Sequence, residues 1–146
     1  MLGYKWIDDI ILGLIDRYGT NNIYEICNDE GIKIVKLDPE NILLNKKEAY
    51  YYRDIEGNEV IFIRNNLDPN LEQFILKHEL GHALLHPDIL SAPYTLSNTG
   101  KLERQANYFA LKLSNLKFDR VELEGMTLEQ ISKYFKIPYK PLEQLF

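Results

Sequence analysis

Residues 78–86 of the chain read HELGHALLH, and this stretch contains all three histidines of the protein. Four residues advance an α-helix by slightly more than one turn, so His78 and His82 lie on the same helix face. Two imidazoles at this spacing can bind one Zn²⁺. Glu79 lies about 100° around the helix from His78, which is the position of the general base in a zinc peptidase. The stretch therefore predicts a metal-dependent hydrolase.

The flanking residues predict a helix over about residues 69–86. Asp68 supplies a capping side chain, Pro69 has the backbone angle of a first helical turn, and Pro87 ends the helix. The histidines share their face with apolar residues at three- and four-residue spacing, namely Leu71, Phe74, Ile75 and Leu85. We therefore expect the histidines to face the core, either as a metal-ligand pair or as packed core residues. Gly81 costs the helix about 1 kcal/mol relative to alanine, which a helix tolerates where another element approaches closely.

A catalytic zinc site needs a third protein ligand beside an open position, and three downstream residues are candidates. His86 continues the same helical row, but three ligands in one row cannot easily surround a tetrahedral ion. Asp88 lies just past the end of the helix and can fold back toward the site. Glu103 begins an apolar segment that predicts a second helix starting near residue 99 or 100. We favour Glu103, with Asn107 one turn later as its hydrogen-bond partner; the alternative is a surface glutamate favoured by the helix dipole.

These segments resemble the ImmA/IrrE-type metallopeptidases, in which HELGHxLLH is followed by a helix carrying ExxANxFA. The second motif matches residues 103–110 here, and the similarity extends over roughly residues 8–115. The resemblance implies a zincin-like α+β fold and a cytoplasmic zinc-dependent endopeptidase. It carries over His78, His82 and Glu103 as metal ligands and Glu79 as the base. Members of this family commonly cleave or inactivate helix-turn-helix repressors of mobile elements or stress genes, so such a repressor is the expected protein partner.

Two departures from the family pattern affect these expectations. Gln105 stands where many relatives have a second acidic residue, which leaves Glu103 as the only nearby carboxylate. After Ala110 the chain continues Leu-Lys-Leu-Ser-Asn, whereas the family often continues toward Leu-Leu-Met-Pro. We therefore expect the rim of the cleft to differ, and details of the substrate do not transfer.

Length and composition predict one compact domain over residues 1–146, of which 45% are hydrophobic. The net charge of −5 and the scattered basic residues argue against direct nucleic-acid binding. The amino terminus lacks a signal-peptide layout, and the apolar run at 10–15 is too short to span a membrane, so we expect a cytoplasmic protein. Cys27 is the only cysteine, which predicts a buried apolar residue, with a reactive thiol as the alternative.

The remaining elements predict an α+β arrangement in which a small three-stranded sheet packs against helices, including the HExxH helix. The expected helices lie at about 4–18, 22–29 and 127–135, and the expected strands at 32–37, 49–54 and 59–64. Gly57 suits the turn of a hairpin between the last two strands. Pro138 and Pro141 predict an irregular tail after the last helix.

We expect a mechanism in which Glu79 takes a proton from zinc-activated water and returns it to the leaving amine. Tyr94 or Tyr108 is a candidate donor to the oxyanion, and an exposed strand edge is a candidate for holding an extended substrate. Mn²⁺ or Fe²⁺ can also occupy a site of two histidines and a glutamate. Two other readings are a regulatory module that carries zinc and binds a repressor without cutting it, and a structural zinc or core-histidine protein.

Overall fold

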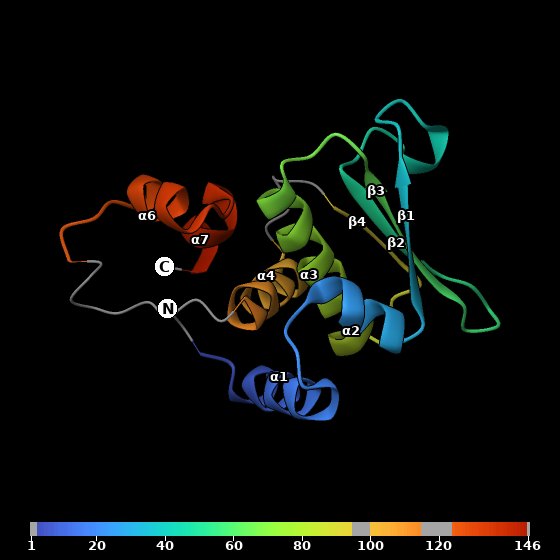
Figure 1. Cartoon of the computed structure of the whole chain (residues 1–146), viewed down its shortest axis with the longest axis horizontal. Helices are drawn as coiled ribbons and strands as arrows, with labels where there is room; N and C mark the ends of the chain where they lie inside the picture. Colours follow the sequence, from blue (N-terminus) through green and yellow to red (C-terminus); the bar gives the residue numbers. More distant parts are fainter. Residues whose placement is uncertain (1–2, 95–99, 115–123, 146) are drawn as a thin grey trace.

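The computed structural model describes residues 3–94, 100–114 and 124–145 (Figure 1). Its regular elements confirm the α+β class. In chain order they are α1 (Lys5–Tyr18), α2 (Ile23–Asp29), β1 (Ile32–Leu37), the 3₁₀ helix η1 (Ile42–Leu44), β2 (Ala49–Arg53), β3 (Glu59–Arg64), α3 (Pro69–Leu85), β4 (Ser91–Tyr94), α4 (Lys101–Leu113), α6 (Leu128–Phe135) and α7 (Tyr139–Leu145). Within the described ranges, no helix has the length and apolar character needed to cross a membrane.

The strands form one sheet in the order β1-β3-β2-β4. β1 runs parallel to β3, and β2 runs antiparallel to both β3 and β4. Ile61 of β3 is paired with Ile34 of β1 on one side and with Tyr51 of β2 on the other. Tyr51, Ile61 and Ile63 are fully buried, because alternate residues of a strand face the same side of the sheet. The core therefore lies between this apolar face and the helices.

The structure adds a fourth strand to the three that the sequence predicts. β1 and β3 have the predicted bounds, and β2 ends one residue earlier than expected. The sequence does not predict β4, because this strand is only four residues long and contains Pro93. Proline cannot donate to a strand ladder, so it is confined to positions such as an edge strand. β4 pairs only with β2 among the described strands, which is such an edge position.

α3 lies in the middle of the molecule, as Figure 1 shows: α4 packs beside it, the sheet lies on one side, and α6 and α7 lie on the other. The Asp68 carboxylate caps the helix by accepting from the Asn70 backbone N–H at 2.9 Å. The helix begins at Pro69 as predicted and ends at Leu85, one residue before the predicted end, with His86 as its C-cap residue. Residues 74–83 are all buried, so α3 is enclosed on every face and carries its polar side chains into the interior.

Gly81 of α3 faces α4 and leaves no room for a side chain of its own. A Cβ atom at Gly81 would lie 3.1 Å from Cδ1 of Phe109 and 3.3 Å from Cα of Ala106. Both contacts are tighter than ordinary van der Waals packing. The absence of a side chain therefore lets α4 lie against α3, which brings the first turn of α4 toward the histidines.

The carboxyl-terminal part contains one confirmed and one wrong expectation. α6 begins with the predicted capping box, in which Thr127 and Gln130 satisfy each other's backbone N–H groups. The predicted irregular tail is instead the helix α7. Pro141 is the third residue of α7, and a backbone N–H at this position has no partner within the helix. The missing N–H of proline therefore removes no helical hydrogen bond. α7 buries Leu142 and Leu145 in the core.

Candidate metal centre

Three donor side chains from two helices converge beside the buried centre of α3. Nε2 of His78 lies 2.9 Å from Oε2 of Glu103, and Nε2 of His82 lies 3.0 Å from Oε1 of the same carboxylate. The two Nε2 atoms are 3.2 Å apart. The three candidate ligand atoms all lie within 4.8 Å of one another. Within the part of the chain that the structure describes, these residues are the cluster that can hold a metal ion.

Each side chain reaches the cluster because of its place on a helix. His78 and His82 are one turn apart on α3 and are 1% exposed. Glu103 lies in the first turn of α4 and is partly exposed. Burial alone would raise the pKa of Glu103, but the contacts with both histidines outweigh it and lower that pKa to about 2. Burial lowers the pKa of His82 and so favours its neutral form, which is the form that can bind a metal.

A second set of contacts fixes the ring of His78. Its Nδ1 lies 2.6 Å from Oδ1 of Asn107, and the Asn107 amide nitrogen donates to Oε1 of Gln144 at 2.8 Å. The sequence predicts Asn107 as a partner of Glu103, whereas the structure places its carbonyl on His78. The phenol ring of Tyr94 meets the imidazole of His78 edge to face, with ring centroids 4.8 Å apart. His78 is therefore held from two sides.

Glu79 is fully buried next to this cluster. Among the described residues, neither carboxylate oxygen has a hydrogen-bond partner of ordinary geometry. Burial raises the pKa of Glu79 well above its usual range, the charge of Glu103 raises it further, and the Tyr51 backbone offsets part of the rise. A buried carboxylate without a partner is costly, and such perturbed groups concentrate at functional sites.

The other candidates lie outside the three-residue cluster. His86 is buried and contacts His82 through Nδ1 at 2.9 Å, so it touches a candidate ligand without joining the donors. Asp88 is exposed beyond the end of α3. The Tyr108 hydroxyl donates to Oδ1 of Asp8 at 2.8 Å, which directs it toward α1 and leaves Tyr94 as the tyrosine beside the cluster.

The sequence does not predict two contacts of the site, that of Gln144 with Asn107 and that of Gln105 with His86. Gln144 belongs to α7, a segment that the sequence predicts to be irregular, and the sequence marks Gln105 only as a departure from the family pattern. Oε1 of Gln105 lies 2.9 Å from Nε2 of His86. Contacts between residues so distant in sequence leave no local signal. An accurate helix prediction for the tail would have made Gln144 a candidate.

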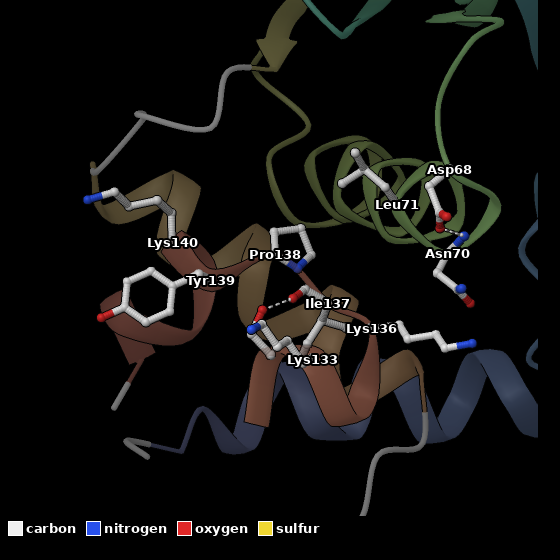
Figure 2. A pocket seen from close by; sticks show the side chains of 10 residues that line it. Asp68, Asn70, Leu71, Lys133, Lys136, Ile137, Pro138, Tyr139 and Lys140 are labelled. Atoms are coloured by element: carbon white, nitrogen blue, oxygen red, sulfur yellow. Dashed lines mark hydrogen bonds between the residues drawn. The ribbon is translucent and has the colours of Figure 1, made fainter. Parts of the chain in front are cut away.

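A separate hollow lies at the other end of α3 (Figure 2). It measures about 680 Å³ and has Leu71 on one side and Ile137 and Pro138 on the other. Its lining contains one carboxylate, that of Asp68, and no histidine or cysteine. Because metal sites need several such donors, this hollow is not a second metal centre.

The sequence matches known proteins over most of its length. Residues 27–144 match the peptidase family model described as the IrrE N-terminal-like domain. The chain is similar to the protein named Metallopeptidase ImmA of Bacillus subtilis (strain 168), with 33% identity over 146 residues that cover 92% of this chain and 80% of the relative. It is also similar to Uncharacterized immunity region protein 2 of Bacillus phage phi105, with 34% identity over 114 residues that cover 75% of this chain and 68% of the relative. No solved structure matches the chain significantly.

Proposed function

The chain belongs to the peptidase family described as the IrrE N-terminal-like domain and is a metallopeptidase, and we propose that it is a zinc-dependent endopeptidase acting on a protein substrate. In this proposal His78, His82 and Glu103 hold the metal and Glu79 is the general base. We further propose that residues 1–146 work as one domain in the cytoplasm. The observation that carries the assignment is the convergence of two imidazole nitrogens and one carboxylate on a single point.

The residues at this point fit a catalytic zinc ion. Two histidines and a glutamate are a known ligand set for catalytic zinc, and they leave a position open for water or substrate. The low pKa of Glu103 keeps its carboxylate ionised, and Asn107 accepts from His78 when Nδ1 carries the proton, which leaves Nε2 free to bind. Mn²⁺ and Fe²⁺ are compatible with the same donors, and zinc is our proposal among them.

The chemistry follows from what each group can do. When bound, the metal acts as a Lewis acid that polarises the peptide carbonyl and makes water more acidic. Glu79 accepts a proton from the water that attacks the carbonyl carbon, and it then donates that proton to the leaving amine. A raised pKa suits this exchange, because the carboxyl group must both accept and release a proton near neutral pH. Hydrolysis then proceeds without a covalent enzyme intermediate.

The edge strand β4 is the candidate platform for the substrate. It is the outer strand beside β2 in the described sheet, and its last residue, Tyr94, contacts His78. An extended peptide can add to such an edge through backbone hydrogen bonds. We propose that a substrate segment binds along β4 with its scissile bond beside Glu79, and that the Tyr94 hydroxyl donates to the developing oxyanion.

We propose a helix-turn-helix repressor as the protein substrate. Support comes from the family resemblance and from the phage relative, whose name places it in an immunity region. The test is to incubate the protein with helix-turn-helix repressors encoded beside its gene, with zinc and with a chelator. We expect fragments with zinc and none with the chelator or with the Glu79→Gln variant.

The same assay separates cleavage from binding. A repressor that is bound equally by wild type and Glu79→Gln but never cut would identify a non-cleaving regulatory module. If a mixed peptide library is cut while no neighbouring repressor is cut, the peptidase assignment stands and the repressor assignment fails. If neither is cut with zinc, manganese or iron, the proposed hydrolysis at this site is wrong.

A further inference from the structure

His86 is the one histidine of the HELGHALLH stretch outside the proposed ligand set, and it lies in a continuous chain of buried contacts. Its Nδ1 lies 2.9 Å from Nδ1 of His82, and its Nε2 lies 2.9 Å from Oε1 of Gln105. All three side chains are at least nine-tenths buried. The chain therefore runs from α4, through the end of α3, to the ring of His82 on the side opposite its contact with Glu103.

The chemistry of the end groups sets the direction of each hydrogen bond. A glutamine carbonyl oxygen only accepts, so Nε2 of His86 must carry the proton in this contact. Neutral His86 then has a lone pair on Nδ1, which can only accept, so Nδ1 of His82 carries the proton there. In neutral His82 this leaves the lone pair on Nε2, the nitrogen that lies 3.0 Å from Glu103.

We propose that His86 and Gln105 are positioning residues that hold His82 in the tautomer and ring orientation that metal binding requires. This inference rests on the metal centre proposed above. Metal-binding histidines usually donate their second ring nitrogen to such an outer partner. His78 has its own chain through Asn107 to Gln144. Each histidine of the centre is thus oriented by a separate chain that ends in an amide oxygen.

Gln105 suits the end of this chain better than a carboxylate would. A glutamate at this position would also accept from His86, but it would add a second negative charge on the helix that carries Glu103. An amide accepts the same hydrogen bond without charge. If Oε1 of Gln105 is removed, Nε2 of His86 no longer needs to carry the proton. The proton of His82 is then free to move from Nδ1 to Nε2, the nitrogen that would bind the metal.

The test compares metal affinity with the stability of the metal-free protein. Zinc affinity is measured by competition with a chromophoric chelator, ligand geometry by the visible spectrum of the Co²⁺ form, and stability by the Tm of the apoprotein. Gln105→Met removes the acceptor with little change in size, and His86→Phe keeps a ring without nitrogen. Gln105→Glu is the matched control because it keeps the acceptor.

We expect Gln105→Met and His86→Phe each to weaken zinc binding by about 10- to 100-fold and to change the Co²⁺ spectrum. Gln105→Glu should stay within a few-fold of wild type. The double variant should lose no more affinity than His86→Phe alone, because both substitutions break one chain. If His86→Phe does not fold, Gln105→Met and Gln105→Glu decide the question.

The possible failures are distinguishable. If wild type binds zinc and His78→Ala does not, while folded Gln105→Met and His86→Phe bind as tightly as wild type, the positioning role is wrong and the metal centre stands. If Gln105→Met lowers the apoprotein Tm and leaves affinity unchanged, the chain is structural only. If wild type itself binds no metal, the metal centre is wrong and the positioning role falls with it.

Discussion

At the scale of single residues, the site combines groups that are stabilised by their neighbours with one that is not. Glu103 is ionised because the histidines face it, and each histidine has partners at both ring nitrogens. Glu79 by contrast is fully buried beside a like charge and lacks an ordinary hydrogen bond among the described residues. This difference fits the proposed roles, in which the metal-binding side chains are held in place before the metal binds and Glu79 exchanges a proton.

Replacing Glu79 by glutamine should therefore separate activity from stability. We expect Glu79→Gln to lower kcat by at least about 10²-fold, the smaller end of the usual contribution of a general acid–base group, while zinc affinity stays near that of wild type. The Tm of the metal-free variant should be no lower than that of wild type, because a neutral amide replaces a buried unpartnered carboxylate. Steady-state kinetics and thermal unfolding measure the two effects. A variant that keeps full activity would exclude Glu79 as the base.

Cys27 should behave as an inert core residue. Its side chain is fully buried, and burial raises the pKa of the thiol to about 12. At pH 8 only about one thiol in ten thousand is then ionised in the native state, and thiolate is the reactive form. We expect negligible labelling of the native protein by a maleimide and complete labelling in denaturant. Rapid labelling of the folded protein would support the alternative of a reactive thiol.

At the scale of elements, the sequence predicts best what local chemistry determines. Strands β1 and β3 have the expected bounds because each is a short segment rich in β-branched residues between glycine or polar residues. Helix α3 follows from its capping aspartate and flanking prolines. The sequence does not predict β4, which is only four residues long and contains Pro93, and it predicts an irregular tail in place of α7 because of Pro138 and Pro141. In β4 the proline occupies an edge strand, and in α7 it occupies the first turn. The edge position of β4 is set by the tertiary fold, and the tolerance of Pro141 is set by where α7 begins.

In the candidate site too, the sequence predicts the features that are local and not the contacts between distant segments. His78, Glu79 and His82 are recognisable because their spacing matches one helical turn. The contact between His86 and Gln105 joins residues 19 apart in sequence, and that between Asn107 and Gln144 joins residues 37 apart. No periodicity relates such pairs. They exist because α4 packs across α3 and α7 packs on α4, which the sequence alone does not specify.

The packing of α3 against α4 makes Gly81→Ala a test of the helix pair. Alanine favours a helix by about 1 kcal/mol over glycine, but the new Cβ would press on Phe109 and on the backbone of Ala106. We expect overpacking, which typically costs about 1–3 kcal/mol, to outweigh the gain and lower the free energy of unfolding. Zinc affinity should fall as well, because the substitution pushes Glu103 away from the histidines.

Gly13→Ala is the matched control for this substitution. Gly13 is an exposed position inside α1, and a Cβ there would meet nothing within 4 Å. The same change should therefore raise stability by about 0.5–1 kcal/mol and leave zinc affinity unchanged. Urea unfolding of both variants measures the difference. A stabilised Gly81→Ala protein with unchanged zinc affinity would show that α4 shifts freely and that its close approach does not position Glu103.

At the scale of the whole molecule, buried polar contacts join α3 to its neighbours at two positions, one near its start and one in its second half. Near its start, the buried Glu72 accepts from the hydroxyl of Tyr24 on α2 and lies 3.1 Å from Nζ of Lys36 on β1. In its second half, the histidines face Glu103 of α4. The contacts near the start join α3 to α2 and β1, and those in the second half join it to α4, on which α1 and α7 pack (Figure 1). Metal binding between α3 and α4 should therefore raise the free energy of unfolding of the whole domain.

Zinc should accordingly raise the Tm of the protein in proportion to the logarithm of its free concentration. A ligand that binds only the native state contributes about 2.7 kcal/mol at one hundred times its Kd. The proposed metal ligands are brought together only by folding, since they come from two helices. Thermal unfolding across a zinc titration measures the shift, and a chelator should reverse it. Glu79→Gln should keep the full shift, whereas His78→Ala and Glu103→Ala should lose most of it. An equal shift in all four proteins would place the bound zinc elsewhere, because a site that survives loss of either residue does not use them as ligands.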